Sequence, residues 1–207
     1  MRTPTRIATT IAATTLLLAT GTAAAVAQST TLDDHHSDVL HYVGEDDQSP
    51  DVLGHTASIR SGVDARQFRI NHGTSFVSLR YSVVHLKADH LEADVTLQRN
   101  GGKHSTDWMA IVRFTAASGT WRAVVFRPGD DVPLCTVRAT VDASRLGSIY
   151  AQVPRSCLGN PTTLRARASL GRHLPATDTR PEEGWGDVVT PTRSTVNAAW
   201  TSWVRRD

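Results

Sequence analysis

The sequence lacks the short motifs that mark most catalytic and cofactor-binding proteins. It contains no G-x-S-x-G, H-E-x-x-H or G-x-G-x-x-G motif and no P-loop, so no signature of nucleophilic, zinc-dependent or nucleotide-dependent chemistry is present. Lysine occurs only at Lys87 and Lys103, and the arginines are scattered along the chain without forming a block. Because nucleic-acid binding needs clustered positive charge, we expect no nucleic-acid partner.

Cysteine is also scarce, since Cys135 and Cys157 are the only two in the 207 residues. In an exported chain two cysteines predict one disulfide bond, and the alternative is a pair of free buried thiols. Alternating residues flank both positions. Pairing Val141 with Ile149 in a hairpin brings Cys135 to within one diagonal step of Cys157, and a kink at Pro154 would join the sulfur atoms.

Long apolar runs are missing, and the one short run lies at the start of the chain. Arg2 and Arg6 precede it, and Ala25–Val26–Ala27 follows it as an A-x-A cleavage site. This pattern predicts a signal peptide over residues 1–27, not a membrane span. We therefore expect a secreted, extracellular product without membrane contact after cleavage. Loss of Arg2 and Arg6 from the 22 basic residues leaves 20 to balance the 20 acidic residues, so the secreted chain is formally neutral.

Residues 28–53 contain seven acidic residues and neither lysine nor arginine. This composition predicts an acidic, flexible leader ahead of the folded domain. The acidic residues are Asp33, Asp34, Asp38, Glu45, Asp46, Asp47 and Asp51.

Histidines interspersed among these acids suggest a metal-capture hypothesis. Carboxylates and imidazoles that are close in sequence suit Zn²⁺, Cu²⁺ or Ni²⁺. The candidate ligands are Asp33, Asp34, His35, His36, Asp38 and His41. A Ca²⁺ site is a second hypothesis, although the spacing does not fit an EF-hand loop. Its candidate ligands are Glu45, Asp46, Asp47 and Asp51, with Asp130 and Asp131 as helpers. A solvated acidic surface without any cofactor is the simpler expectation for both sets.

Strand-like alternation recurs over residues 54–172. Around Ser118–Gly119, a tight turn places Trp121 opposite Ala116 and Val125 opposite Val112. Trp121 and Val125 then share the face that holds Trp108 and Phe114, which predicts a core face. Residues Leu164, Ala166, Ala168 and Leu170 alternate with Arg165, Arg167 and Ser169 in the same way.

Eight or nine such segments with Gly/Pro turns, and no convincing helix before the tail, predict an all-β fold, an antiparallel β-sandwich, over residues 54–172. Residues 173–207 are expected to form a loop and a C-terminal tail that packs on this domain.

Several of these features resemble small exported β-sandwich proteins of actinobacteria. The resemblance rests on the acidic start, the paired central strands, the segment Val153–Pro161 (VPRSCLGNP) and the ending Trp203–Arg206 (WVRR). It implies export and a β fold. That group has no established activity, so the resemblance implies no site residues.

Aromatic residues outside the predicted core are candidates for ligand contacts. Trp185 lies in the glycine-flanked segment Glu183–Gly186, where an exposed ring would need a partner. Tyr150, Trp200 and Trp203 are further candidates. The leading hypothesis is a secreted, non-catalytic module that binds an extracellular protein or polysaccharide. The alternatives are a hydrolase with a loop-borne site and metal capture by the Asp/His-rich leader.

Overall fold

The chain forms one antiparallel β-sheet with very little helix. The computed structural model describes residues 28–44, 49–100, 109–193 and 197–206, which include 13 paired strands. The strands are β1 (Gln28–Asp33), β2 (Leu40–Val43), β3 (Asp51–Val52), β4 (Ala65–His72), β5 (Phe76–Val84), β6 (Leu91–Arg99), β7 (Met109–Ala117), β8 (Thr120–Phe126), β9 (Cys135–Asp142), β10 (Leu146–Pro154), β11 (Thr163–Leu174), β12 (Glu183–Val188) and β13 (Val204–Arg205). The helical elements are α1 (His55–Ser61) and the 3₁₀ turn η2 (Arg155–Leu158).

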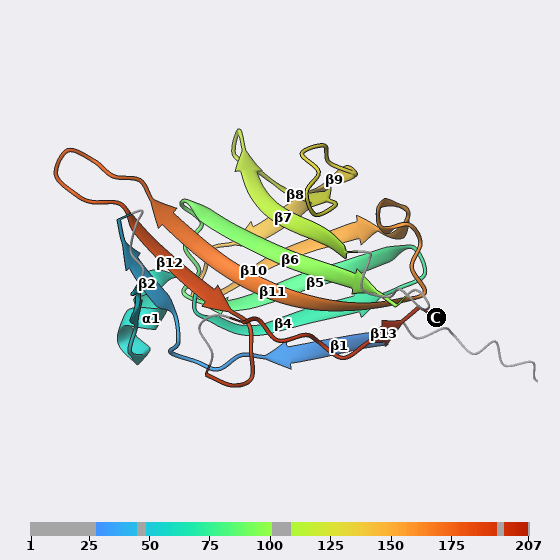
Figure 1. Cartoon of the computed structure of the whole chain (residues 1–207), viewed down its shortest axis with the longest axis horizontal. Helices are drawn as coiled ribbons and strands as arrows, with labels where there is room; N and C mark the ends of the chain where they lie inside the picture. The colour runs from blue at the N-terminus through green and yellow to red at the C-terminus, as the bar shows by residue number, and fades with distance from the viewer. Residues whose placement is uncertain (1–27, 45–48, 101–108, 194–196, 207) are drawn as a thin grey trace, which may run out of the picture.

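The strands pair in the order β1-β4-β5-β10-β9-β8-β7-β6-β11-β12-β2-β3, and β13 pairs with β11. The all-β, antiparallel prediction is confirmed. Eight of the described strands, β4 to β11, begin within residues 54–172, where eight or nine were expected, and β1–β3, β12 and β13 extend the sheet beyond that range. The pairing runs continuously through β9, which joins β10 on one edge and β8 on the other. The long strands are strongly curved, so β4 and β5 lie across the core from β6 and β11 (Figure 1).

The core lies inside this curled sheet. Tyr81 in β5 is fully buried, and its ring packs edge-on against Phe68 and Phe114. Its hydroxyl reaches across to the backbone carbonyls of Asp94 in β6 and Ser169 in β11, at 2.7 and 3.1 Å. The two sides of the curled sheet are therefore joined by apolar packing and by a hydrogen-bonded tyrosine that has no water contact.

The predicted strand registers are confirmed where the structure describes them. Ala116 pairs with Trp121, Val112 with Val125, and Val141 with Ile149. The predicted alternation over residues 164–170 is also confirmed, because Leu164, Ala166, Ala168 and Leu170 are buried, whereas Arg165 is half-buried and Arg167 is exposed. Trp108, predicted to share the core face, lies outside the described residues.

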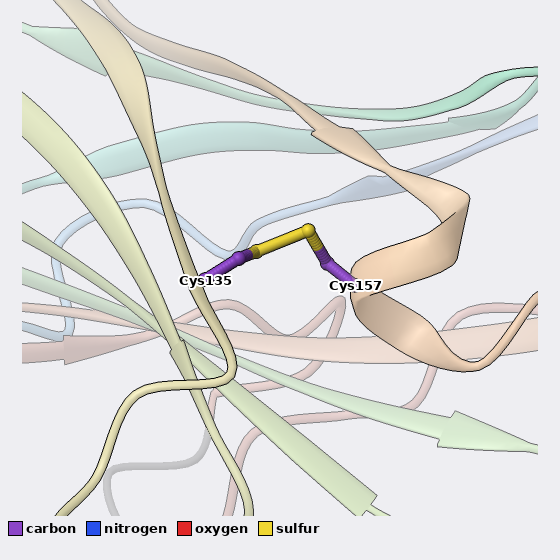
Figure 2. Close-up of a disulfide and its surroundings, with 2 residues drawn as sticks. All are labelled: Cys135 and Cys157. Carbon is purple, nitrogen blue, oxygen red and sulfur yellow. A yellow bond between two sulfur atoms is a disulfide. The ribbon is translucent and has the colours of Figure 1, made fainter.

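Cys135 in β9 and Cys157 in η2 form the predicted disulfide bond, with their Cα atoms 5.9 Å apart (Figure 2). The chain leaves β10 at Pro154 and turns into η2, which carries Cys157 to Cys135. The bond thus ties the end of one hairpin strand to the start of its partner.

Two segments differ from the sequence prediction. Residues 28–53 are not a flexible leader over their described part, since β1 pairs with β4 and β2 pairs with β12 and β3. The C-terminal tail packs on the domain as predicted, but residues 173–207 are not simply a loop, because β11 runs to Leu174 and β12 and β13 both pair with it. Composition predicted these segments wrongly because their order comes from pairing with distant strands, which local propensity does not report.

Residues 56–60 form part of α1, although the sequence predicted strands and no helix in this region. The helix ends at Gly62, which has a φ of 84°. A Cβ atom at this glycine would lie 2.6 Å from Cγ of Lys87, so both the turn and the packing favour glycine here. Within the described parts of the chain, none of the helices has the length and apolar character needed to cross a membrane.

Candidate functional site: an outer polar face and a buried acidic cluster

The outer face of β6, β7 and β11 carries polar side chains in adjacent rows, and we call this set of side chains the grid: Asp94, Thr96, Arg113, Arg167 and Ser169. Arg167 of β11 is paired with Thr96 of β6, and one row further along Ser169 is paired with Asp94. Because paired residues of an antiparallel sheet point to the same side, these side chains stand next to one another on the surface. Asp94 is neutralised by Arg113 of β7, whose Nε and Nη2 donate to its two oxygens at 3.1 and 3.2 Å.

The C-terminal segment adds two indole rings to this face. The guanidinium carbon of Arg165 lies 4.6 Å from the ring centre of Trp200 and 4.7 Å from that of Trp203. Arg167 approaches Trp200 to 5.2 Å. The segment is fixed beneath the rings, since Thr201 N–H donates to Ala166 O at 2.8 Å. The predicted ligand residues Trp200 and Trp203 therefore both contact the same guanidinium group, that of Arg165.

A hollow of about 270 Å³ lies between the grid and the C-terminal segment. Its polar lining comes from Asp94 and Thr96 of β6, Arg167 and Ser169 of β11, and Asn197. Arg167 and Asn197 are exposed. Charged, hydroxyl and amide groups from three segments thus converge on a concave surface, and one of its lining residues, Arg167, also contacts Trp200.

The net charge of this face is positive. Asp94 is satisfied by Arg113, and neither Arg165 nor Arg167 has a carboxylate within salt-bridge distance among the described residues. Arg165 donates instead to Gln98 Oε1 at 2.7 Å. Two guanidinium groups without anionic partners give the face a preference for negatively charged ligands.

Trp185 and Tyr150 do not belong to this face. The Trp185 ring is half-buried and stacks on His41, with ring centres 5.3 Å apart, and the Arg172 guanidinium lies 5.1 Å from its centre. Trp185 therefore already has partners on both sides and packs against the core. Tyr150 lies on β10, paired with Arg80 of β5 and Thr140 of β9.

A buried acidic cluster lies where the start of the chain meets α1, β4 and β12. Asp34, Asp64 and Asp187 place one carboxylate oxygen each within 4.8 Å of one another. Their residues are 7, 1 and 2 % exposed, and Asp38 close by is 2 % exposed. Asp34 Oδ1 accepts from Thr190 N–H at 2.6 Å, and Asp187 Oδ2 accepts from Ala65 N–H at 2.7 Å.

Burial changes the ionisation of this cluster. Burial, together with the neighbouring carboxylates, raises the pKa of Asp34 to about 9 and the pKa of Asp187 to about 8. Burial also raises the pKa of Asp64, which the backbone N–H of Ser37 and the nearby His36 partly oppose. Asp34 Oδ2 and Asp187 Oδ1 accept no hydrogen bond from the described residues. The cluster is therefore an unusual concentration of acid in a protein interior.

The predicted metal ligands are only partly brought together. Asp34 and Asp38 join the cluster, and His35 lies at its rim with Nδ1 4.0 Å from Asp38 Oδ2. The others do not converge: His36 is exposed, His41 stacks on Trp185, Asp33 accepts from Gln67, and Asp51 is exposed in β3. Asp130 and Asp131 are exposed near a turn after β8, and Glu45, Asp46 and Asp47 lie outside the described residues.

Sequence reasoning missed Asp64 and Asp187. Both were visible as single acids among apolar neighbours, in Val63–Asp64–Ala65 and in Asp187–Val188–Val189. An acid in the middle of a buried pattern is a signal of pairing or of ligand binding. The metal-site prediction did not include Asp64 and Asp187 because neither residue lies near the Asp/His-rich segment in the sequence.

One serine–histidine contact lies beside the cluster. Ser37 Oγ is 2.9 Å from His55 Nδ1, and Ser37 has a φ of 71°. His55 also lines a larger hollow, of about 630 Å³, together with His85, Lys87 and part of α1.

Comparisons with protein-family models, with curated proteins and with solved structures gave no significant match to this chain.

Proposed function

We propose that this protein is an exported, non-catalytic module that binds an acidic polysaccharide through the outer face of β6 and β11. The observation that carries the proposal is the hollow of about 270 Å³ in which Arg167, Asn197 and Thr96 converge beside Trp200. Arginine supplies two parallel donors to a sugar carboxylate, and hydroxyl and amide groups match sugar hydroxyls. The exposed part of the Trp200 ring that Arg165 and Arg167 leave uncovered adds an apolar contact for a sugar at the edge of the hollow.

Export is part of this proposal. It is supported by the signal-peptide pattern of residues 1–27 and by the disulfide bond between Cys135 and Cys157, which is typical of an oxidising compartment. The resemblance to small exported actinobacterial proteins points the same way. In this proposal the curled sheet is the rigid scaffold that holds the ligand-binding residues in place, a role for which the sequence predicted a β-sandwich.

Affinity electrophoresis in gels that contain polygalacturonate tests the proposal, with dextran as the neutral comparison. We expect retardation by polygalacturonate and none by dextran. The substitution Arg167→Gln removes one charged donor pair from the hollow and should weaken binding about tenfold. Trp200→Leu should weaken it by a similar factor.

Arg122→Gln is the matched control, because Arg122 is an exposed arginine on the outer face of β8, away from the hollow. It should leave retardation unchanged. Equal loss of binding in R122Q and R167Q would show attraction by general positive charge, and absence of retardation in the unsubstituted protein would remove the proposal altogether.

A second candidate is hydrolysis at Ser37. The observation that favours it is the contact between Ser37 Oγ and His55 Nδ1, together with the left-handed backbone of Ser37, a combination that occurs at activated serine nucleophiles. A fluorophosphonate probe should then label Ser37 in the intact chain and should not label S37A. Absence of labelling contradicts this candidate and leaves the polysaccharide proposal unaffected.

A further inference from the structure

We propose that Asp34, Asp64 and Asp187 form a binding site for a single Ca²⁺ ion, with Asp38 as an additional carboxylate of the same site. The proposal concerns buried side chains and not the outer polysaccharide face, although Val188 next to Asp187 lines the hollow, and it does not depend on that function. It rests on the burial of the carboxylates, on their mutual distances and on the oxygen atoms that lack donors.

The first argument is the cost of the arrangement without a cation. Two of the three carboxylates have an oxygen, Asp34 Oδ2 and Asp187 Oδ1, that accepts no hydrogen bond from the described residues. Both side chains are more than nine-tenths buried. The backbone N–H groups that donate to these two carboxylates each reach only one of the two oxygens, as Thr190 N–H does with Asp34 Oδ1. Unpaired carboxylate oxygens in a protein interior destabilise the fold unless a proton or a cation compensates them.

The second argument is the geometry. The three ligand oxygens lie within 4.8 Å of one another. Ca²⁺ binds oxygens at about 2.3–2.6 Å, so ligands on opposite sides of the ion are about 4.6–5.2 Å apart. One Ca²⁺ ion can therefore touch all three carboxylates. Mg²⁺ requires a near-ideal octahedron at about 2.1 Å and fits a fixed set of side chains less well.

The third argument is the type of donor. The converging atoms are all carboxylate oxygens, which hard cations prefer, whereas Zn²⁺, Cu²⁺ and Ni²⁺ favour sites with nitrogen or sulfur. The histidines of the same segment stay outside the cluster, because His35 and His36 are exposed and His55 contacts Ser37. The site therefore differs from the metal capture that the sequence suggested.

The ligands come from three separate segments of the chain, since Asp34 and Asp38 share the connection between β1 and β2. Asp34 follows β1, Asp38 precedes β2, Asp64 precedes β4, and Asp187 lies within β12. Backbone hydrogen bonds already hold the first segment in place, as Asp34 N–H donates to Arg66 O at 2.9 Å and His35 N–H to Thr190 O at 2.8 Å. A bound cation would tie the start of the domain to two distant strands and so would stabilise the folded state.

Calorimetric titration and thermal unfolding of the full secreted chain, after removal of metals with EDTA, test this proposal. We expect one Ca²⁺ bound per chain at pH 7.5. The unfolding temperature should be higher in about 1–5 mM CaCl₂, a concentration near that at which extracellular calcium sites fill, than in the same concentration of MgCl₂. Asp187→Asn keeps the volume of the side chain and an acceptor for Ala65 N–H. It should nevertheless weaken Ca²⁺ binding about tenfold or more, since a direct ligand loses its charge.

The behaviour of D187N without metal separates a cation site from a merely structural cluster. Since a neutral amide of nearly the same size replaces a buried acid, the metal-free variant should unfold at a temperature equal to or above that of the metal-free parent, while its response to Ca²⁺ is lost. Asp64→Asn should show the same loss of response. Asp142→Asn, at an exposed position in β9, is the matched control and should bind Ca²⁺ normally.

Three results would overturn the proposal. They are no Ca²⁺ binding at millimolar concentration, binding that D187N and D64N leave unchanged, or a site that takes Mg²⁺ or Zn²⁺ in preference to Ca²⁺.

Discussion

Arg155 donates a hydrogen bond from Nε to His72 Nε2 at 3.2 Å, and both side chains are buried. The same guanidinium donates to Thr74 O at 2.9 Å and to Pro161 O at 2.6 Å. His72 Nδ1 lies 3.3 Å from Val204 O, so the neutral ring donates from Nδ1 and accepts at Nε2. Burial lowers the pKa of His72, and the Arg155 charge lowers it further. This pair connects β4, η2 and the C-terminal β13.

The first prediction concerns Arg155, the arginine of the segment Val153–Pro161. Arg155→Met keeps much of the apolar volume but removes the donor to the buried Pro161 carbonyl and to His72, and the donor to Thr74 O. The free energy of unfolding should fall by about 3 kcal/mol, measured by urea denaturation. Arg122→Met, at an exposed position, should change it by no more than about 0.5 kcal/mol. Equal effects of the two substitutions would mean that the buried network contributes nothing to stability.

The second prediction concerns pH in the absence of divalent cations. The pKa values of Asp34 and Asp187, about 9 and about 8, lie above the value of 3.8 for an unperturbed aspartate. Between these limits the folded state holds protons that the unfolded state releases, so stability is greatest at low pH and falls as pH rises from about 4 to about 9. Guanidinium denaturation in EDTA at pH 5 and pH 8 measures the decline.

The double variant D34N/D187N is the control for this decline, because neither asparagine titrates. Its stability should change less between pH 5 and pH 8 than that of the parent. The remaining charged groups that face the cluster are Asp38, Asp64, His36, His55 and Arg66, and they persist in the variant. A decline of the same size in parent and variant would place its origin outside the cluster.

The third prediction concerns the disulfide bond. Cys135 and Cys157 are 22 residues apart in the sequence, and closing a loop of this length stabilises the fold by about 3 kcal/mol in the chain-entropy description. The double variant C135S/C157S should therefore lose about that much in urea denaturation. Treatment of the parent with a reducing agent should reproduce the loss and should have no effect on the double variant.

The fourth prediction concerns Trp185, which the sequence suggested as a ligand residue. Because its ring is packed between His41 and Arg172, Trp185→Ala should lower the free energy of unfolding by about 2–3 kcal/mol. It should leave retardation by polygalacturonate unchanged under conditions where the variant is folded. Loss of binding in folded W185A, with normal stability, would restore Trp185 as a ligand residue.

The sequence by itself determined the local order of the central strands. Alternation around Ser118–Gly119 predicted the pairing of Trp121 with Ala116, because a shift of one residue would have turned every apolar side chain away from the core. The disulfide between Cys135 and Cys157 followed from the same alternation, continued through the hairpin of β9 and β10. These features depend on residues that are close in sequence, and so their pattern can be read locally.

Only the tertiary structure decided what the acidic start of the chain does. From the sequence, Asp34 and Asp38 were expected to be solvated acids. In the structure, β1 and β2 pair with distant strands, and this pairing brings both residues close to Asp64 and Asp187. Trp200 and Trp203 were predicted as ligand residues, but their position beside Arg165 depends on how the C-terminal segment lies along β11. Burial and charge proximity are properties of contacts between residues far apart in the chain, and local composition does not contain them.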